Sequence, residues 1–325
     1  MTDTTTRNPK AMRIAVIDVG TNTALLLIAE RTADGRLRAL HEASRFVRLG
    51  EGVDAARRIG TAALERLRTA LLDYRAQAEA WDAHPILVAG TSASRDAENR
   101  DELVAFVRHE TGLRYEVLSG EDEARWSFEG AVSAFDERPG PCIVFDVGGG
   151  STEVVAGTPG DAREPARLTF RRSLDVGAVR LTERCFEAQP PPPDGVEAAR
   201  TLIDHALEAV PMPAPGTPLI GAAGTAVSLA LVHHGARAWA GLPPGDVTLT
   251  RADVRRWRER LLAATFDEVL ALNPAVMAGR ADVFPAGVLV FERVMRRLGT
   301  PVCRISPRGL RHGLALRFFR QNRPD

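Results

Sequence analysis

The sequence predicts an α/β fold built from two related domains, and three observations support this prediction. Short apolar runs typical of strands alternate with segments that have the spacing of amphipathic helices. The chain has 325 residues, which is long for a single core. A strand-and-turn pattern also occurs twice, as IAVIDVGTNT at 14–23 and as IVFDVGGGST at 143–152. We therefore expect two halves that face one ligand from opposite sides.

The first half shows the alternation from its start. In the region 61–81, apolar residues that include Leu64, Leu67 and Leu71 recur at helical spacing, which predicts a long amphipathic helix. Runs rich in valine, leucine and isoleucine predict buried strands around it. In chain order, we expect strands at 13–18 and 24–30, the helix at 61–81, a strand at 86–89, a helix at 99–110, a strand at 115–118 and a helix at 123–135.

The second half begins with a strand that leads through its glycine turn into another strand. The proline-rich run at 190–193 indicates a stiff surface loop rather than a polyproline ligand. Thr250 is placed to cap a helix with Asp253 as its capping-box partner, and Pro285 should start its helix late or kink it. The expected elements are strands at 142–147, 152–156, 219–220 and 302–305 and helices at 196–210, 225–233, 251–264, 281–298 and 309–319.

Each repeated turn has the residues of an anion site. A buried strand delivers a carboxylate, Asp18 or Asp146, to its C-terminal end. The glycines that follow let backbone N–H groups converge on an anion. One copy could be a buried strand and a tight turn, but two copies indicate a phosphate-bearing ligand between the halves. Hydroxyl donors are present in both turns, from Thr21, Thr23, Ser151 and Thr152.

Composition argues against several classes of function. The formal net charge is zero, so no overall field attracts the chain to nucleic acid or to a membrane. Among the 42 basic residues only Lys10 is a lysine, so an anion site should use arginine. Cys142, Cys185 and Cys303 form no C-x-x-C pair, and their odd number argues against a disulfide framework. With no long apolar stretch and no signal-peptide core at the start, we expect a cytoplasmic protein.

Short motifs follow one another along the chain: IDVGTNT (17–23), GTSASRDAEN (90–99), SGEDEAR (119–125), FDVGGGSTE (145–153), GAAGT (221–225), GRADV (279–283) and SPRGLRHG (306–313). Together they resemble the exopolyphosphatase/guanosine pentaphosphate phosphatase (Ppx/GppA) family. The resemblance implies two actin-like (ribonuclease H-like) domains with a ligand cleft between them. Longer relatives append helical domains, so the chain is similar to a short, two-domain form.

The resemblance places the domain boundaries, and the run Pro139-Gly140-Pro141 indicates one hinge between them. We expect an N-terminal domain at 1–138, completed by the C-terminal helix at 309–325, and a second domain at 139–308. The N-terminal domain then carries the first phosphate turn, Arg95 and Glu123, and the second carries the other turn. Closure of the cleft would use hinges near Phe135–Pro141 and near Ser306–Gly309.

Roles for individual residues also follow from the resemblance. In the family, the second acid of the SGxEEA segment is the proposed general base, and Glu123 occupies that position. Asp122 stands where the pattern has the first glutamate, which is a mild departure. Arg95 follows a predicted strand in a loop, where its planar fork can hold a phosphate, and Asn99 closes the same motif. We expect Asp96 to be a helix N-cap rather than a ligand.

Asp146 and Glu153 flank the second glycine turn, and family members typically require Mg²⁺. Two acids beside a phosphate-binding turn suit a hard cation, although Asp146 could cap its own turn and Glu153 could point outward. Asp18 would join through water. The other expected substrate-binding residues are Gly20, Thr21, Asn22, Thr23, Asn99, Gly148, Gly149, Gly150, Ser151, Thr152, Gly224 and Thr225, with Arg280 and Arg308 as weaker candidates.

The implied function is a Mg²⁺-dependent exopolyphosphatase that releases orthophosphate from the end of inorganic polyphosphate. A pppGpp 5′-phosphohydrolase of the stringent response shares the motifs and is the first alternative. An ATP-dependent kinase is less favoured because no sugar-binding motif is evident, and a non-catalytic sensor is less favoured because all candidate acids are present. Resemblance to dimers implies a homodimer, for which these apolar residues could supply a surface or form core instead: Val288, Leu289, Val290, Phe291, Phe318 and Phe319.

Overall fold

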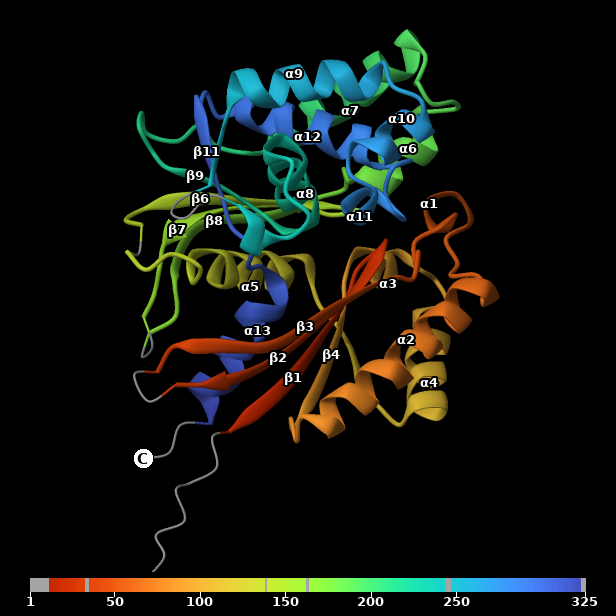
Figure 1. Ribbon diagram of the computed structural model, residues 1–325, viewed down its shortest axis with the longest axis vertical. Helices are drawn as coiled ribbons and strands as arrows, with labels where there is room; N and C mark the ends of the chain where they lie inside the picture. The colour runs from red at the N-terminus through yellow and green to blue at the C-terminus, as the bar shows by residue number, and fades with distance from the viewer. Residues whose placement is uncertain (1–11, 33–34, 138, 162–163, 243–246, 323–325) are drawn as a thin grey trace, which may run out of the picture.

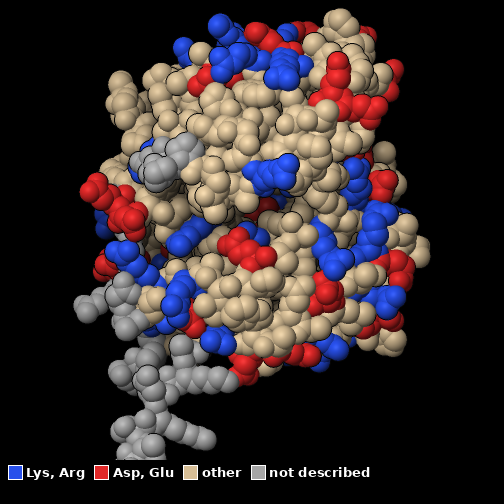
Figure 2. All heavy atoms as spheres, in the orientation of Figure 1, with Lys and Arg blue, Asp and Glu red and all other residues tan. Residues whose placement is uncertain are grey.

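The computed structural model describes residues 12–32, 35–137, 139–161, 164–242 and 247–322, and it has the predicted α/β architecture. A five-stranded sheet and a six-stranded sheet are stacked with helices α5 and α13 between them (Figure 1). Other helices cover the outer side of each sheet (Figure 1). On the face shown in Figure 2, acidic and basic side chains are interspersed, as a net charge of zero leads one to expect.

The first sheet has the strand order β3-β2-β1-β4-β5. Strands β1, β2 and β3 form an antiparallel meander, while β1, β4 and β5 pair in parallel. Strands β1 and β2 are mostly buried, because they consist largely of isoleucine, leucine, valine and alanine. The bounds are β1 (Arg13–Val19), β2 (Thr23–Arg31), β3 (Leu37–Phe46), β4 (Ile86–Gly90) and β5 (Tyr115–Val117).

Helices α2 and α4 cover one face of the first sheet (Figure 1). Leu67, Leu71 and Tyr74 of α2 are fully buried, as the amphipathic pattern predicts. The Tyr74 hydroxyl satisfies its hydrogen bond by donating to the carbonyl of Ala24 in β2 over 2.9 Å. The helices of this half are α1 (Val53–Ala56), α2 (Thr61–Ala80), α3 (Ser92–Asp96) and α4 (Arg100–Thr111).

The second sheet has the strand order β10-β11-β9-β6-β7-β8. Strand β6 is buried at every residue, and it pairs antiparallel with β7 and parallel with β9. This arrangement repeats the mixed pairing of β1 in the first sheet. The bounds are β6 (Cys142–Val147), β7 (Thr152–Thr158), β8 (Arg167–Leu174), β9 (Leu219–Ala222), β10 (Thr248–Thr250) and β11 (Val302–Ile305).

Three strands, β3, β8 and β10, are absent from the sequence prediction, and all three lie at a sheet edge. Most residues of β3 are partly or fully exposed. Strand β8 carries three arginines, and β10 has only three residues. An edge strand has one pairing neighbour and little buried surface, so its sequence shows only a weak apolar pattern.

Helix α12 is the central helix of the second half. Pro285 lies in its first turn, so the helix begins late, as predicted. Val288–Phe291 are fully buried in the core of this half and offer no dimer surface. Thr250 and Asp253 form the predicted capping box at the start of α9. The helices are α6 (Ala178–Cys185), α7 (Pro193–Leu207), α8 (Ala223–His234), η1 (Trp239–Gly241), α9 (Arg251–Leu262), α10 (Phe266–Leu272), α11 (Pro274–Met277) and α12 (Phe284–Arg297).

Helices α5 (Gly120–Val132) and α13 (Leu310–Gln321) cross between the two sheets (Figure 1). At the crossing their backbones touch: a Cβ atom on Gly130 would overlap the Gly309 carbonyl, and one on Gly313 would overlap the Trp126 carbonyl. Only glycine permits this approach. Apolar side chains of α5 pack on the second sheet and those of α13 on the first. Helix α5 therefore packs on the second sheet, although it precedes the boundary expected after residue 138.

Two further findings concern the covalent and membrane properties of the chain. The three cysteines are buried and free, in agreement with the prediction that they form no disulfide framework. Among the described residues, none of the helices combines the length and the apolar character needed to cross a bilayer.

Candidate active site

The two repeated turns adopt the same backbone geometry. In the first turn the N–H of Gly20 donates to the carbonyl of Thr23 over 2.9 Å, and in the second the N–H of Gly148 donates to the carbonyl of Ser151 over 2.9 Å. Each turn joins an antiparallel pair, β1 with β2 and β6 with β7. The repeat in the sequence is therefore also a repeat in structure.

The turns pack against each other through Thr21. A Cβ atom on Gly149 would lie 2.9 Å from the Cβ of Thr21, and one on Gly150 would lie 2.8 Å from Thr21 Oγ1 and overlap the Ser92 hydroxyl. Contacts this close are not available to any larger residue. The glycine run of the second turn thus reflects its contact with the first half of the molecule.

A cavity of about 140 Å³ lies between the turns. The starts of α8 and α12 also contribute to its wall. Of the predicted site residues, the following line it: Asp18, Gly20, Thr21, Asn22, Thr23, Glu123, Asp146, Gly148, Gly149, Gly150, Ser151, Glu153, Gly224 and Thr225. The residues that the sequence singled out in separate segments are therefore neighbours in space.

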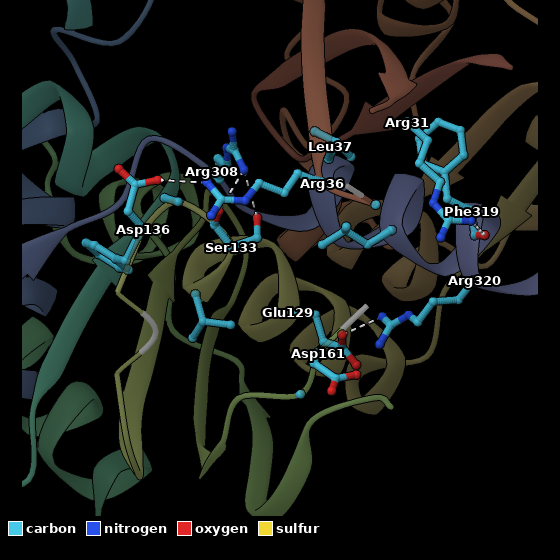
Figure 3. A pocket seen from close by; sticks show the side chains of 16 residues that line it. Arg31, Arg36, Leu37, Glu129, Ser133, Asp136, Asp161, Arg308, Phe319 and Arg320 are labelled. Carbon is cyan, nitrogen blue, oxygen red and sulfur yellow. Dashed lines mark hydrogen bonds and ion pairs between the residues drawn. The ribbon is translucent and has the colours of Figure 1, made fainter. Parts of the chain in front are cut away.

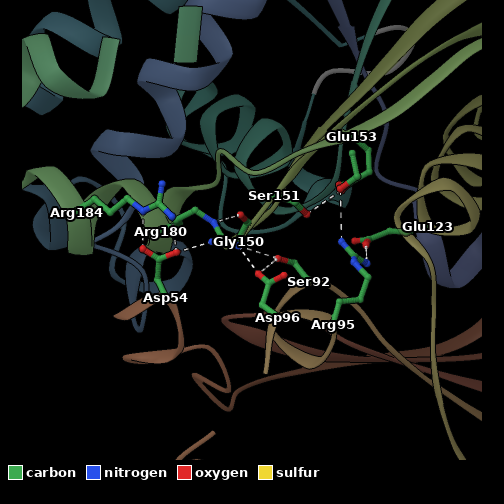
Figure 4. Close-up of polar contacts among 11 residues, drawn as sticks. Asp54, Ser92, Arg95, Asp96, Glu123, Gly150, Ser151, Glu153, Arg180 and Arg184 are labelled. Carbon is green, nitrogen blue, oxygen red and sulfur yellow. Dashed lines mark hydrogen bonds and ion pairs between the residues drawn. The ribbon is translucent and has the colours of Figure 1, made fainter. Parts of the chain in front are cut away.

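Glu123 reaches the cavity from the first turn of α5, which Ser119 caps by accepting a hydrogen bond from the N–H of Asp122 over 3.1 Å. The Glu123 carboxylate is buried and forms an ion pair with Arg95 of α3 (Figure 4). Arg95 also donates to the carbonyl of Leu118 over 3.3 Å. Helices α3 and α5 follow the parallel strands β4 and β5, so both side chains lie beyond the carboxyl edge of the first sheet.

Asp146 and Glu153 are direct partners in the ladder of β6 and β7, so they project to the same side of the second sheet. Glu153 Oε1 accepts hydrogen bonds from the hydroxyls of Ser151 and Ser173, each over 2.7 Å. Ser173 also accepts a hydrogen bond from Arg95 over 3.4 Å. Sequence reasoning missed Ser173, because it lies in β8, the edge strand that shows no clear apolar pattern.

Four carboxyl groups share this cavity: Asp18, Glu123, Asp146 and Glu153. Burial raises the pKa of Asp18 to about 7. Burial, followed by the negative charge of Glu153, raises the pKa of Glu123 and that of Asp146 well above the usual carboxyl range. Burial likewise raises the pKa of Glu153. The site therefore holds four carboxyl groups but only two nearby guanidinium groups, Arg95 beside Glu123 and Arg280 at the cavity wall.

Three predicted roles are not supported by the contacts. Asn99 lies away from the cavity, where its side chain accepts from the N–H of Ile59 over 2.9 Å and donates to the Ile59 carbonyl over 3.1 Å. The Thr152 hydroxyl donates to the carbonyl of Val176. Asp96 ends α3 instead of capping a helix, and it forms an ion pair with a side chain of α6. We assign Asn99 and Thr152 to the scaffold, because their polar atoms are already bonded to backbone.

Two other predicted residues connect the cavity wall to its surroundings. Asn22 donates to the carbonyl of Gly279 over 3.3 Å and so bridges the two halves. Thr225 donates to the carbonyl of Val147 over 2.9 Å and fixes the start of α8 to the strand before the second turn. Both side chains line the cavity, although their hydrogen bonds hold backbone.

Arg280, a weaker candidate from the sequence, lies at the wall of this cavity. It lines the cavity and donates to the carbonyl of Gly224 over 3.1 Å and to the Ser228 hydroxyl over 2.8 Å. Burial lowers its pKa to about 10. Its Nε is buried and has no hydrogen-bond partner among the described residues. The GRADV motif contains this residue, but only the structure shows that it lies at the cavity wall.

A second, larger cavity of about 420 Å³ lies near the C-terminal ends of α5 and α13 (Figure 3). Its arginines already have polar partners. Arg320 pairs with Glu129, and Arg308 donates to the carbonyl of Ser133 over 2.7 Å. Arg308, a weaker candidate from the sequence, therefore lies outside the cavity between the turns. This larger cavity contains neither of the glycine turns.

Comparison with known proteins now identifies the chain. A model of the Ppx/GppA phosphatase family matches residues 27–321. The chain belongs to this family. Exopolyphosphatase 2 of Mycobacterium tuberculosis is 36% identical over 320 residues, which span 94% of this chain and 98% of that relative. Among solved structures, an exopolyphosphatase from Cytophaga hutchinsonii has a TM-score of 0.83 at 26% identity, covering 96% of this chain and 99% of its own.

A Ppx/GppA family member from Aquifex aeolicus matches with a TM-score of 0.77 and 26% identity, over 97% of this chain and all of that one. The predicted family and the predicted α/β fold are therefore confirmed. The first turn, Glu123 and the second turn line one cavity, and Arg95 lies behind Glu123 as its ion-pair partner.

Proposed function

We propose that the protein is a Mg²⁺-dependent exopolyphosphatase, which hydrolyses the terminal phosphoanhydride of inorganic polyphosphate. The observation that carries this proposal is the position of Glu123, paired with Arg95, at a cavity lined by the two glycine turns. The relatives named exopolyphosphatase, which match nearly the whole chain, support the choice of substrate.

The glycine turns and the arginine would hold the terminal phosphoryl group. The N–H groups of Gly149 and Gly150 donate no hydrogen bond to the described residues and lie at the cavity wall. Backbone N–H groups arranged in this way stabilise a phosphate and the charge that develops on it during transfer. Arg95 adds a planar fork that can bind two phosphate oxygens.

Glu123 would act as the general base. Its carboxylate removes a proton from water, the water oxygen forms a bond to the terminal phosphorus, and the bond from that phosphorus to the bridging oxygen breaks. Orthophosphate and a chain shorter by one phosphate leave, and the proton passes from Glu123 to solvent. Burial raises the pKa of Glu123, which brings its basicity closer to neutral pH.

Asp146 and Glu153 are the residues that would hold Mg²⁺. The donor set fits, because carboxylate oxygens are ligands for this ion and the cavity is short of positive charge. No group of three or more acidic, histidine or cysteine side chains in the described residues forms a metal cage. That also suits Mg²⁺, which usually binds one or two carboxylates together with water and substrate phosphate. When bound, the ion would neutralise charge on the transferred phosphoryl group.

The size of the cavity indicates which part of the substrate it encloses. At about 140 Å³ it is smaller than typical pockets for whole organic ligands, which measure about 300–1,000 Å³. It therefore suits the end of a chain of phosphates, with the remainder outside. The same end occurs in pppGpp, so pppGpp is the substrate that the test must separate from polyphosphate.

The experiment compares orthophosphate release from long-chain polyphosphate, short-chain polyphosphate, pppGpp and ATP, with and without Mg²⁺. We expect the highest kcat/KM for polyphosphate and a loss of activity without the metal. Preference for pppGpp would replace the proposed substrate, and full activity in a chelator would remove Mg²⁺. Glu123→Gln provides the matched inactive control.

The remaining expectations are also proposals. Two domains that close on substrate, with hinges near Phe135–Pro141 and Ser306–Gly309, are consistent with the crossing of α5 and α13 between the sheets. Homodimerisation and a cytoplasmic location stay predictions. Mass from light scattering at micromolar concentration tests the dimer, which now has to use a surface other than the buried Val288–Phe291.

A further inference from the structure

Arg180 of α6 is a buried arginine that connects the second half of the molecule to the first. Its relative exposure is only 6%. It forms ion pairs with Asp54 of α1 and with Asp96 of α3, both of which belong to the first half (Figure 4). A buried guanidinium is stable only when it is paired and well bonded. This pairing therefore depends on the two halves being in contact.

The same guanidinium also fixes the second glycine turn. Arg180 Nε donates to the carbonyl of Gly150 over 2.7 Å. The first N–H groups of α6 hold the carbonyls of Gly148 and Gly149 at 2.7–3.1 Å. In a trans peptide the C=O and N–H bonds point in opposite directions. Because α6 holds these three carbonyls, the N–H groups that follow them are turned away from α6, and the turn they belong to lines the cavity.

The network ends beside the arginine that faces Glu123. Asp96, the partner of Arg180, is the neighbour of Arg95 in α3. The start of α3 is held as well, since Arg180 donates to the Ser92 hydroxyl over 3.4 Å. Arg180 thus fastens the helix that carries Arg95 to the turn that carries the N–H donors.

We infer that Arg180 is a positioning residue that assembles the phosphate site only when the two halves close. With the halves apart, Asp54 and Asp96 move away with the first half, and the Gly150 peptide loses the order that the guanidinium gives it. Substrate that contacts both halves then favours the assembled state. The consequence for catalysis rests on the proposed function, but the effect of Arg180 on closure does not.

Arg184 supplies a matched control on the same helix. It also pairs with Asp54, but its side chain is 42% exposed and it makes no contact with the glycine turn. Although burial works in the other direction, the contacts with Arg184 and Arg180 lower the pKa of Asp54, so both arginines stabilise its charge. Removing Arg184 therefore removes a similar charge without releasing the turn.

The first test is kinetic. Phosphate release from long-chain polyphosphate with Mg²⁺ is measured for Arg180→Met, Arg180→Lys, Asp96→Asn and Arg184→Met. We expect kcat to fall about 100-fold in Arg180→Met, because a small misplacement of a bound phosphate has an effect of this size. Lysine should restore activity only in part, since an ammonium group cannot bond the turn and both acids at once. Asp96→Asn should lose about tenfold, and Arg184→Met should stay within about twofold.

The second test needs no substrate. Small-angle scattering of the ligand-free protein should give a larger radius of gyration for Arg180→Met than for wild type or Arg184→Met. If Arg180→Met does not fold, as judged by circular dichroism, Asp96→Asn takes its place and should expand as well. An unchanged radius, or kinetics of Arg180→Met equal to those of Arg184→Met, overturns the inference. Expansion together with an absence of phosphate release from wild type overturns the proposed function and leaves the inference intact.

Discussion

The two glycine turns share a backbone and differ in their chemistry. Gly20 and Gly148 make equivalent hydrogen bonds, and each turn follows a strand that ends near an aspartate. In the first hairpin, Asp18 is paired across the ladder with Leu25. In the second hairpin, Asp146 is paired with Glu153. One turn therefore carries a single acid, and the other carries two.

The two turns also differ in the size of the side chains that follow the first glycine, and here the first turn has the larger ones. The first turn continues with Thr21, while the second continues with Gly149 and Gly150, which leave room for Thr21. The Thr21 side chain of the first turn thus occupies the space that the glycines of the second turn leave open. Two turns with the same backbone can therefore have different roles. The second turn contains the two acids and the N–H donors, and the first turn supplies the side chain that packs against it.

The largest expected effect tests this division of acids. Asp146→Asn should reduce kcat by about 10³-fold or more, because loss of a proposed Mg²⁺ ligand would remove several kcal/mol of transition-state stabilisation. Asp18→Asn, the matched change in the first turn, should cost much less. Steady-state kinetics over a Mg²⁺ titration checks both variants. Equal losses would show that the two turns share the metal equally.

Glu123→Gln should come next, with a fall in kcat of roughly 10²- to 10⁴-fold, the range for a general base. Substrate affinity should change little, because the amide keeps the shape of the side chain. Single-turnover kinetics together with equilibrium binding separates the two quantities. Wild-type turnover in this variant would exclude Glu123 as the base.

Alanine at the glycines tests the packing of one turn on the other. Gly150→Ala should lower kcat/KM by about 100-fold, since its Cβ would lie 2.8 Å from Thr21 Oγ1 and would push the halves apart. Gly20→Ala should cost less than tenfold, because the nearest atom to its Cβ is the Thr23 carbonyl oxygen at 3.2 Å. Similar losses in the two variants would contradict a packing role specific to the second turn.

Arg95→Lys should have a moderate effect. The lysine keeps the charge but cannot bind two phosphate oxygens at once, so kcat/KM should fall about tenfold, which corresponds to one charge-assisted hydrogen bond of about 1.5 kcal/mol. Kinetics with short-chain polyphosphate measures this loss. A lysine variant equal to wild type would mean that the fork does not contact substrate.

The smallest expected effect is on the stability of the fold, and it involves residues that pack in the first half of the molecule. Burial lowers the pKa of His312 in α13 to about 4, against 6.5 in the unfolded chain. Although burial works in the other direction, contacts with His312 and Arg311 lower the pKa of Glu42 in β3 to about 2. The unfolded chain then binds more protons, so stability falls as the pH drops from about 6.5 toward 4 and falls further below 4.5. His312→Gln should flatten the upper part of this decline in thermal melts; an unchanged slope would assign it to other groups.

Much of the site could be predicted because its signals are local. A strand, an aspartate and a glycine turn stand together in the chain, so the sequence alone selects Asp18, Asp146 and the turn glycines, which line one cavity in the structure. A local signal does not fix the direction of a side chain: Asn99 lies in the matching motif, but its side chain bonds the backbone of Ile59.

The parts that could not be predicted depend on distant segments. Ser173 reaches the site only because β8 pairs with β7, and β8 is an edge strand with a polar sequence. Arg180 is one of many arginines in the sequence, and its role follows from contacts with Asp54 and Asp96, which come from far earlier in the chain. Contacts of this kind leave no hydrophobic period and no compositional bias in the sequence, so they cannot be predicted from it.

The close backbone contact at Gly130 fixes the orientation of α5, so any rotation of this helix would pivot about that residue. Glu123 lies seven residues before that glycine, about 10 Å along the helix axis at 1.5 Å per residue. A rocking of α5 by about 10° would therefore carry the Glu123 carboxylate by about 2 Å, from the simple product of angle and arm length. General-base catalysis tolerates far less than that, since the proton must be taken within hydrogen-bond reach. Two glycines outside the cavity, Gly130 and Gly313, thus determine how accurately the proposed base is placed.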